Sequence, residues 1–230
     1  MFQLILSDCT HLSLSELKRK HTHSYSAEEA ATAGACESER DSILHLGGRI
    51  FLREALSALT GITPLGHEIR RAPCGKPYMR APQDAEIHFN ISHSWPLLVV
   101  GIARGHEIGV DIENENRAVD PLRIAARFFS PEERTALQSV PVKLQRYEFF
   151  RLWTLKEAVV KATGQGLHMP LDSFTVITKG EAPDLTLVEG ISPPMRLGHQ
   201  LQGGYHLAWA IGDGIGSRQD IRPEIQHLSL

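Results

Sequence analysis

The order of the apolar patterns limits the fold most, because a helical pattern followed by short β-rich runs occurs twice in 230 residues. In the first half, apolar residues recur near helical spacing over 43–59, and Gly61 ends the pattern. In the second half, a helical pattern covers 147–163 and ends at Gly164. This order predicts an α+β protein with two pseudo-symmetric halves. The two halves are residues 1–114 and 115–230.

Shorter elements are predicted around the two long helices. Residues 2–6 favour a strand, and residues 8–39 favour a loop with some helix. Three β-rich runs predict an antiparallel meander over 86–92, 97–103 and 107–113. In the second half, Pro follows Asp120 and Ser130, a pattern typical of helix starts. The last strands are expected over 174–178, 185–188 and 205–211, with a loop rich in Pro and Gly over 190–204.

The composition argues against several classes of protein. Lys and Arg number 24 against 27 Asp and Glu, and a net charge of −3 gives no general attraction to nucleic acid. Three widely spaced cysteines without a CxxC pair favour neither a disulfide framework nor a thiolate zinc site. The longest apolar run, 95–103, is far below the ~20 residues of a membrane span, and no basic leader precedes residues 1–6. We expect a soluble cytoplasmic monomer without membrane or nucleic-acid partners.

Two carboxylates share one face of the strand predicted over 107–113. Gly109, Asp111 and Glu113 alternate with apolar residues, so their side chains point to the same side of the strand. Side chains at i and i+2 start about 6–7 Å apart and can converge on one hard cation, for which Mg²⁺ is the natural candidate. Gly109 would leave space beside the carboxylates. The alternative is a solvated strand face without a metal ion.

The helix predicted over 147–163 carries a third carboxylate in line with a lysine. Trp153, Glu157 and Lys161 are spaced i, i+4 and i+8, whereas Lys156 is expected to point elsewhere. Glu157 would add a third oxygen ligand for Mg²⁺, and water and a substrate phosphate would complete the octahedron. Lys161 would then face the phosphates. The alternative is an exposed Glu–Lys pair, which stabilises a helix by about 0.2–0.5 kcal/mol.

Two shorter segments have groups suited to phosphate oxygens. The turn Gly75-Lys76-Pro77 holds Lys76 at a defined place. The segment 90–94 ends a predicted strand with hydroxyl groups, an imidazole and backbone amides. Each segment alone would equally suit an ordinary turn. The sequence has no HExxH, GxSxG, GxGxxG or P-loop motif, so zinc proteases, serine hydrolases, dehydrogenases and P-loop NTPases lose their support.

The order of these segments is more specific than any one of them. They are GKP at 75–77, FNISHS at 89–94, GVDIE at 109–113, FFSPEE at 128–133 and WTLKEAVVK at 153–161. Together they resemble the 4′-phosphopantetheinyl transferases of the two-half, surfactin-synthetase-activating type. In its length and its Gly48-Arg49 position the chain is similar to the bacterial holo-acyl-carrier-protein synthases of that type.

The resemblance implies a Mg²⁺-dependent transfer of 4′-phosphopantetheine from coenzyme A to a serine of an apo acyl or peptidyl carrier protein, releasing adenosine 3′,5′-bisphosphate. The resemblance places the site in a cleft between the two halves, where Asp111, Glu113 and Glu157 would hold Mg²⁺. Lys161 would stabilise the leaving phosphate, and Glu157, or otherwise Glu133, would take the serine proton. The implied coenzyme A contacts are Lys76, Pro77, Ser92, His93, Lys161, Arg49 and Arg53.

One position departs from the family pattern. Many relatives have an arginine four or five residues before Arg49, where this chain has Leu44 and His45. Arg40, Arg49 or Arg53 could supply the missing cation for the 3′-phosphate of coenzyme A.

A docking surface for the carrier protein is predicted downstream of the two strand carboxylates. Arg117, Arg123 and Arg127 lie in this segment, Arg123 and Arg127 share one helix face, and Phe128 and Phe129 follow at once. A basic ridge beside an apolar pair would suit an acidic carrier protein. The alternative is a solvated helix face with both Phe side chains in the core.

Two other functions remain open on the residues alone. Three carboxylates and a lysine would also serve a metal-dependent phosphodiester or pyrophosphate hydrolase. The other is a non-catalytic module that binds a nucleotide or a carrier protein. The pathway of the carrier is open as well, among fatty acid, polyketide and peptide synthesis.

Overall fold

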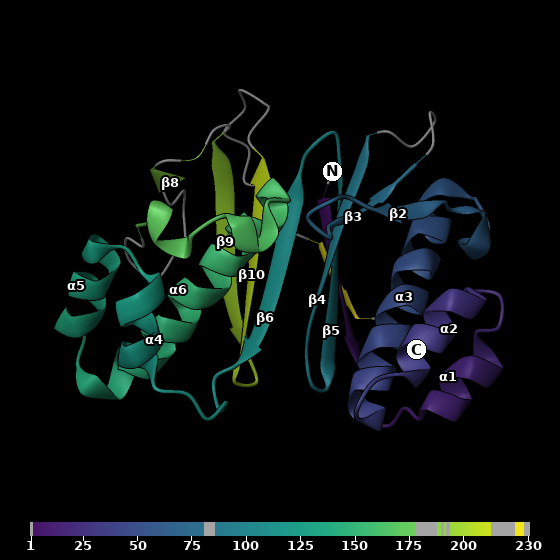
Figure 1. Cartoon of the computed structure of the whole chain (residues 1–230), viewed down its shortest axis with the longest axis horizontal. Helices are drawn as coiled ribbons and strands as arrows, with labels where there is room; N and C mark the ends of the chain where they lie inside the picture. The colour runs from purple at the N-terminus through teal and green to yellow at the C-terminus, as the bar shows by residue number, and fades with distance from the viewer. Residues whose placement is uncertain are drawn as a thin grey trace.

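The computed structural model describes residues 2–80, 86–177, 188–189, 191, 194–212 and 224–227. Its strands lie in the middle, with a group of helices on either side (Figure 1). One group contains α1 (Leu14–Lys20), α2 (Ala27–Gly34) and α3 (Glu39–Thr60). The other contains α4 (Pro121–Phe128), α5 (Pro131–Ser139) and α6 (Val142–Thr163). The predicted α+β architecture of two similar halves is therefore confirmed, and in the part of the chain that the structure describes each half has one long α-helix and two short ones.

The strands form two principal sheets, with the orders β11-β1-β5-β4 and β6-β10-β9. Neighbouring strands are antiparallel, except that β11 runs parallel to β1. The strands are β1 (Phe2–Asp8), β4 (Ile87–Ser94), β5 (Leu97–Arg104), β6 (Ile108–Asn114), β9 (Met195–Gln202), β10 (Tyr205–Gly212) and β11 (Glu224–His227). Two short pairs join β2 (Ile69–Arg71) to β3 (Pro77–Met79) and β7 (Thr175–Val176) to β8 (Val188–Glu189). Single turns of 3₁₀ helix occupy Pro64–Gly66, Gly166–His168 and Leu171–Ser173.

The helix ends follow the signals in the sequence. Asp120 caps α4 by accepting the Arg123 amide, and Ser130 and Glu133 form a reciprocal capping box at the start of α5. Both long helices end where Gly61 and Gly164 adopt left-handed backbone conformations, with φ of 75° and 69°. The region 8–39 contains α1 and α2, so it is more helical than predicted.

The predicted meander is wrong at its third strand. β4 and β5 pair as expected, but β6 pairs with β10 and belongs to the second sheet. The boundary expected after residue 114 therefore does not follow the sheets, which divide between β5 and β6. β11, at the other end of the chain, joins β1 in the first sheet.

Two strand predictions near the C-terminus also need correction. The loop expected over 190–204 contains β9, which pairs with β10 along its whole length. Of the strands expected over 174–178 and 185–188, β7 covers two residues and β8 covers 188–189, while 178 and 185–187 lie outside the described residues. The strand expected over 205–211 is confirmed as β10.

One apolar core joins the two sheets. Val99 of β5, Val110 of β6 and Leu207 of β10 belong to a single buried cluster. Long helix α3 packs on the opposite face of the first sheet, and α6 packs on that of the second. Among the described residues, no helix is both long enough and apolar enough to cross a membrane.

Candidate active site

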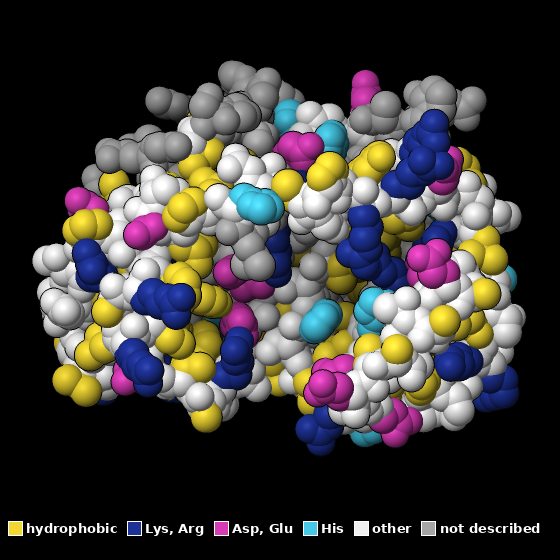
Figure 2. All heavy atoms as spheres, in the orientation of Figure 1, with side chains coloured by type: hydrophobic (Ala, Val, Ile, Leu, Met, Phe, Trp, Pro, Cys, Tyr) yellow, Lys and Arg dark blue, Asp and Glu magenta, His cyan; other side chains and the backbone are white. Residues whose placement is uncertain are grey.

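A cavity of about 340 Å³ opens where β4, β6 and α6 meet. Its lining is Ile91, Ser92 and His93 from β4, Asp111, Ile112 and Glu113 from β6, and Trp153, Glu157 and Lys161 from α6. Acidic, basic and His side chains gather around a hollow between the two groups of helices (Figure 2). The cavity thus brings together segments that are up to about seventy residues apart in the sequence.

Close packing of β6 against α6 forms the floor of the cavity. A Cβ atom on Gly109 would lie 2.0 Å from the Ala158 carbonyl oxygen of α6, so only glycine permits this approach. The predicted space at Gly109 therefore serves the helix backbone and not the carboxylates. The side chains of Ile108, Val110 and Ile112 point into the shared core, and Asp111 points to the opposite face, as the alternation predicts.

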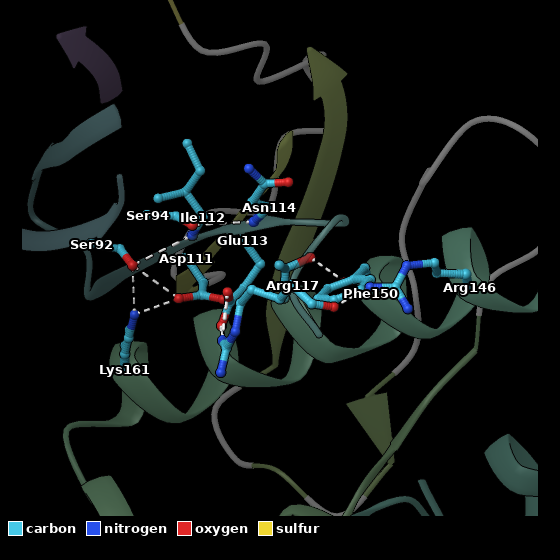
Figure 3. A network of polar contacts seen from close by, with 11 residues as sticks. Ser92, Ser94, Asp111, Ile112, Glu113, Asn114, Arg117, Arg146, Phe150 and Lys161 are labelled. Atoms are coloured by element: carbon cyan, nitrogen blue, oxygen red, sulfur yellow. Dashed lines mark hydrogen bonds and ion pairs between the residues drawn. The ribbon is translucent and has the colours of Figure 1, made fainter. Parts of the chain in front are cut away.

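Asp111, Lys161 and Ser92 form a closed triangle of hydrogen bonds (Figure 3). Lys161 Nζ lies 2.6 Å from Asp111 Oδ1 and 2.9 Å from Ser92 Oγ, and the Ser92 hydroxyl donates to the same Asp111 oxygen at 2.9 Å. Asp111 is 5% exposed, and its other oxygen, Oδ2, is buried without a hydrogen-bond partner in the described structure. A buried oxygen of this kind is available to a ligand of the cavity.

The other two carboxylates have different surroundings. Arg117 binds both oxygens of Glu113, at 2.7 and 2.8 Å, whereas Glu157 makes no hydrogen bond to any described residue. Burial raises the pKa of Glu113, and burial together with the charge of Asp111 raises the pKa of Glu157. Both groups therefore hold a proton to a higher pH than an exposed glutamate does. On the same wall, burial and the charge of Lys161 lower the pKa of His93.

The donor set suits a hard cation, although the three carboxylates are not grouped as a finished metal site. Within the described residues, no three Asp, Glu, His or Cys side chains are close enough to hold a metal ion. The partners explain this, because Asp111 faces Lys161 and Glu113 faces Arg117. Each carboxylate oxygen accepts about two hydrogen bonds, so the pairing with Arg117 leaves lone pairs on Glu113. With the free Oδ2 of Asp111 and the unbonded Glu157, oxygen donors remain on all three residues.

Lys76 and Pro77 line a neighbouring cavity of about 350 Å³. The Lys76 ammonium group donates to Glu107 at 2.5 Å and to the Ala162 carbonyl oxygen near the end of α6 at 2.8 Å. The hydrogen bonds from His88 and Lys76 outweigh burial and lower the pKa of Glu107 to about 2. The structure thus holds Lys76 at a defined place, as predicted, beside α6 and outside the carboxylate cavity.

A third cavity, of about 560 Å³, is lined mainly by basic side chains, together with two carboxylates of α2. The basic residues are His45, Arg49 and Arg53 of α3 and Arg70 and Arg71 of β2, and the carboxylates are Glu28 and Glu29. Burial and the nearby charge of Arg71 lower the pKa of Arg49, which marks a crowded positive site. The sequence reasoning missed Arg71, although the Arg70-Arg71 pair shortly before Gly75-Lys76-Pro77 was a usable signal.

Arg53 and Arg40 are engaged elsewhere. Arg53 is 7% exposed and binds Glu29 and the carbonyl oxygens of Pro64 and His67, so its donors fix the fold around α3. Arg53 also lines the third cavity, so its contact with coenzyme A stays a prediction, with most of its donors already bonded. Arg40 lies over the Trp95 ring, 5.3 Å from its centroid.

The structure does not bring Glu133 to the carboxylate cavity. Its side chain is 1% exposed, with one oxygen 2.6 Å from Lys156 Nζ and the other accepting the Ser130 amide. The alternative assignment of Glu133 as a base is thus at odds with its position in the core. Lys156 also donates to the Phe174 carbonyl oxygen at 2.7 Å and points away from the cavity, as predicted.

Comparisons with known proteins agree with this arrangement. Residues 15–103 match the model of the N-terminal region of 4′-phosphopantetheinyl transferases, and residues 107–210 match the model of the 4′-phosphopantetheinyl transferase superfamily. A 4′-phosphopantetheinyl transferase of Bacillus subtilis is 36% identical over 169 residues, which cover 73% of each chain. The chain belongs to the 4′-phosphopantetheinyl transferase superfamily.

Other 4′-phosphopantetheinyl transferases are similarly close. The enzyme called ffp of Bacillus subtilis is 32% identical over 186 residues, with 80% of each chain covered, and Sfp of Bacillus subtilis strain 168 is 30% identical over 171 residues, with 74% covered. A holo-(acyl-carrier-protein) synthase of Bacillus anthracis, solved in complex with CoA (3′,5′-ADP), is similar at a TM-score of 0.41 and 18% identity, over 46% of this chain and 94% of that one. In this transferase the two family models divide between β5 and β6, where the sheets divide.

Proposed function

We propose that the carboxylate cavity is the place where this 4′-phosphopantetheinyl transferase moves phosphopantetheine from coenzyme A to a carrier-protein serine. The observation that carries the proposal is the convergence of Asp111, Glu157 and Lys161 on one cavity. Enzymes of this superfamily generally use Mg²⁺ and coenzyme A. The chain is a 4′-phosphopantetheinyl transferase that acts on carrier proteins. We infer the roles of its individual residues from the geometry of the cavity.

The cation would be held by Asp111, Glu113 and Glu157. Support comes from the free buried oxygen of Asp111 and from the two glutamates on the same cavity wall. Bound there, Mg²⁺ would neutralise charge on the pyrophosphate oxygens. Because Mg²⁺ needs ionised ligands and burial raises the pKa of both glutamates, we infer that its affinity weakens as the pH falls through their raised pKa values.

The transfer then needs a proton acceptor and a stabilised leaving group. The serine oxygen forms a bond to the pantetheine-side phosphorus, and the bond from that phosphorus to the bridging oxygen breaks, which releases adenosine 3′,5′-bisphosphate. Glu157 takes the serine proton, since it lines the cavity beside Lys161 and makes no hydrogen bond to another described residue. Lys161 faces the negative charge that develops on the leaving phosphate.

The nucleotide would extend from Ser92 and His93 toward Lys76 and Pro77, with its 3′-phosphate at the cationic cavity. Arg49 and Arg71 are the cations that support this assignment, because both line that cavity and Arg53 is engaged by Glu29. Of the three arginines considered for the 3′-phosphate, Arg40, Arg49 and Arg53, we therefore assign the contact to Arg49. Burial and the charge of Arg71 disfavour the charged form of Arg49, Glu29 offsets this in part, and a phosphate bound at this cavity would favour the charged form further.

Arg49→Ala is expected to reduce the preference for coenzyme A over dephospho-coenzyme A by about 10–100-fold, since a hydrogen bond to a charged group contributes about 1.5–3 kcal/mol. The measurement is the ratio of kcat/KM for the two substrates. Arg40→Ala is the matched control, because Arg40 lies over Trp95 and should leave the ratio unchanged. An unchanged ratio in Arg49→Ala would place the 3′-phosphate elsewhere.

The carrier protein would dock on α4. Val119, Ile124 and Phe128 contribute to the lining of an apolar cavity of about 340 Å³, and Arg123 and Arg127 lie exposed at its edge. Phe129 is 1% exposed and belongs to the core, so only Phe128 of the predicted apolar pair is available. Arg117, next along the ridge, is bound to Glu113.

The double variant Arg123→Glu, Arg127→Glu is expected to raise KM for the carrier about tenfold and to flatten its dependence on salt, while KM for coenzyme A stays constant. The reason is that charges at the rim of an interface act mainly through long-range attraction. Arg19→Glu with Arg104→Glu reverses two exposed charges far from α4 and serves as the control. Wild-type carrier KM and salt response in the α4 variant would mean that the carrier docks on another surface.

One assay separates the proposed function from its alternatives. The protein is incubated with coenzyme A, Mg²⁺ and an apo carrier protein, and the intact mass of the carrier is measured. A mass gain equal to phosphopantetheine supports transfer. Breakdown of coenzyme A without that gain would indicate a hydrolase, and binding without either change would indicate a non-catalytic module. Running the assay across acyl and peptidyl carriers identifies the preferred partner.

A further inference from the structure

The two sheets meet along β4 and β6, and side chains join the strands at this seam. Within the described residues, β4 has backbone pairing with β5 and β6 has backbone pairing with β10, but β4 and β6 share no ladder. Three β4 side chains accept hydrogen bonds from β6 amides instead. The pairs are Asn90 Oδ1 with Val110 N at 3.0 Å, Ser92 Oγ with Ile112 N at 3.4 Å, and Ser94 Oγ with Asn114 N at 3.2 Å. Figure 3 includes the last two.

The spacing of these bonds places the carboxylates between fixed points. Alternate residues of a strand face the same side, so 90, 92 and 94 reach β6 together and the amides that they bind belong to 110, 112 and 114. Asp111 and Glu113 are the intervening residues of β6. Each carboxylate residue therefore lies between two amides that β4 anchors.

Two of the three anchored amides belong to buried residues, whereas the third belongs to Asn114, which is partly exposed. Val110 and Ile112 are 0% and 2% exposed, and Asn90 is 6% exposed. A buried amide without an acceptor is unfavourable, so loss of an anchoring side chain would drive β6 to shift until its amides found other partners. The opposite edge of β6 is held by β10, where Asp111 is opposite Ala208. The β4 side chains thus fix β6 relative to the half that carries Lys76 and His93.

We propose that Asn90 and Ser94 are positioning residues that set the affinity of the carboxylate cavity for a divalent cation. The proposal rests on the assignment of Asp111, Glu113 and Glu157 as the cation ligands. Ser92 is left out because its hydroxyl also touches Asp111 and Lys161. Asn90 and Ser94 do not line the cavity and act through the backbone of β6.

The test is binding of Mn²⁺, a paramagnetic probe, measured by electron paramagnetic resonance on the full chain with saturating coenzyme A and no carrier protein. Asn90→Ala and Ser94→Ala are each expected to weaken Mn²⁺ binding by about 10–100-fold, the range for residues that orient metal ligands. Ser94→Thr keeps the hydroxyl group and should restore binding. Ser7→Ala is the matched control, since the Ser7 hydroxyl is buried on β1 without a partner in the described structure.

The outcomes separate the inference from the proposed function. If Asp111→Asn abolishes Mn²⁺ binding while Asn90→Ala and Ser94→Ala bind as tightly as the wild type, the inference is overturned and the ligand set stands. If the wild type binds no Mn²⁺, the ligand set falls and the inference falls with it. Ser94 is only partly buried, so Ser94→Ala decides the question should Asn90→Ala fail to fold. Weakened binding with circular dichroism like that of the wild type supports the inference.

Discussion

Asp111→Asn should lower kcat/KM for phosphopantetheine transfer by at least about 10³-fold while the protein remains folded. The variant has the shape of aspartate, and its amide oxygen can still accept from Lys161, but it lacks the charge that a cation needs. Stabilisation of phosphate charge by a metal ion contributes several kcal/mol, and each 1.36 kcal/mol is tenfold in rate. The measurements are transfer kinetics at saturating Mg²⁺ and coenzyme A and, separately, Mg²⁺ binding by calorimetry.

Glu157→Gln should lower kcat/KM by a similar factor, because Glu157 is proposed both to bind the cation and to accept the serine proton. Glu148→Gln provides the matched control on the same helix, since Glu148 pairs with Arg151 and lies outside the cavity. Near-wild-type turnover by Asp111→Asn would be incompatible with the proposed ligand set.

Lys156→Met should reduce the free energy of unfolding by about 3–5 kcal/mol, a large share of the 5–15 kcal/mol of an ordinary protein. Methionine matches the length of lysine but leaves the Glu133 carboxylate buried without its cation. The cost is high because both side chains are almost fully buried, at 0% and 1% exposure. The measurement is urea unfolding followed by circular dichroism.

The double variant Lys156→Met, Glu133→Gln should recover much of that loss, since no buried charge is then left unpaired. Lys143→Met, an exposed lysine of the same helix, is the control and should change the free energy of unfolding by less than about 0.5 kcal/mol. A loss below 1 kcal/mol in Lys156→Met would mean that this pair does not hold α5 and α6 together.

Local signals in the sequence predicted the helices well. A capping Asp or Ser, a following proline and a terminal glycine each act within one turn of the chain, so the starts of α4 and α5 and the end of α6 were predictable. The start of α6 was not, because the helix begins at Val142, before the predicted residue 147, and no side chain caps it. The grouping of Asp111, Glu157 and Lys161 followed from strand alternation and helical spacing combined with the family resemblance. Periodicity predicted which side chains of each element share a face, and the family resemblance supplied the meeting of that strand with that helix.

The sequence pattern did not predict β9 because Gly198 inside the strand, Pro194 before it and Gly203 after it are all typical of loops. Gly198 lies under the Trp209 ring of β10, and a Cβ atom there would be 2.1 Å from the ring. The glycine therefore marks close packing in a strand. A second signal was available in Gly203-Gly204, whose φ angles of 57° and 81° form the tight turn between β9 and β10.

The sequence pattern did not predict which distant strands pair with each other. The strand β6 follows β5 closely, yet pairs with β10 almost a hundred residues later, and nothing in 107–113 indicates that preference. The side chains of Arg53 and Glu133 had suitable chemistry for the site, but burial beside Glu29 and Lys156 assigns them to the fold. Whether such a charged side chain serves the site or forms an ion pair in the core depends on which helices pack beside it, and the sequence pattern does not contain that information.

The way the two sheets draw strands from different parts of the chain limits how this protein could be divided or recombined with a relative. The second sheet takes β6 from directly after β5, and the first sheet takes β11 from the far end of the chain. A cut between β5 and β6 would leave each fragment with an apolar sheet face that only the other fragment covers. The two halves are consequently one cooperative unit, and swapping a half between relatives would require the shared core and the seam to be exchanged together.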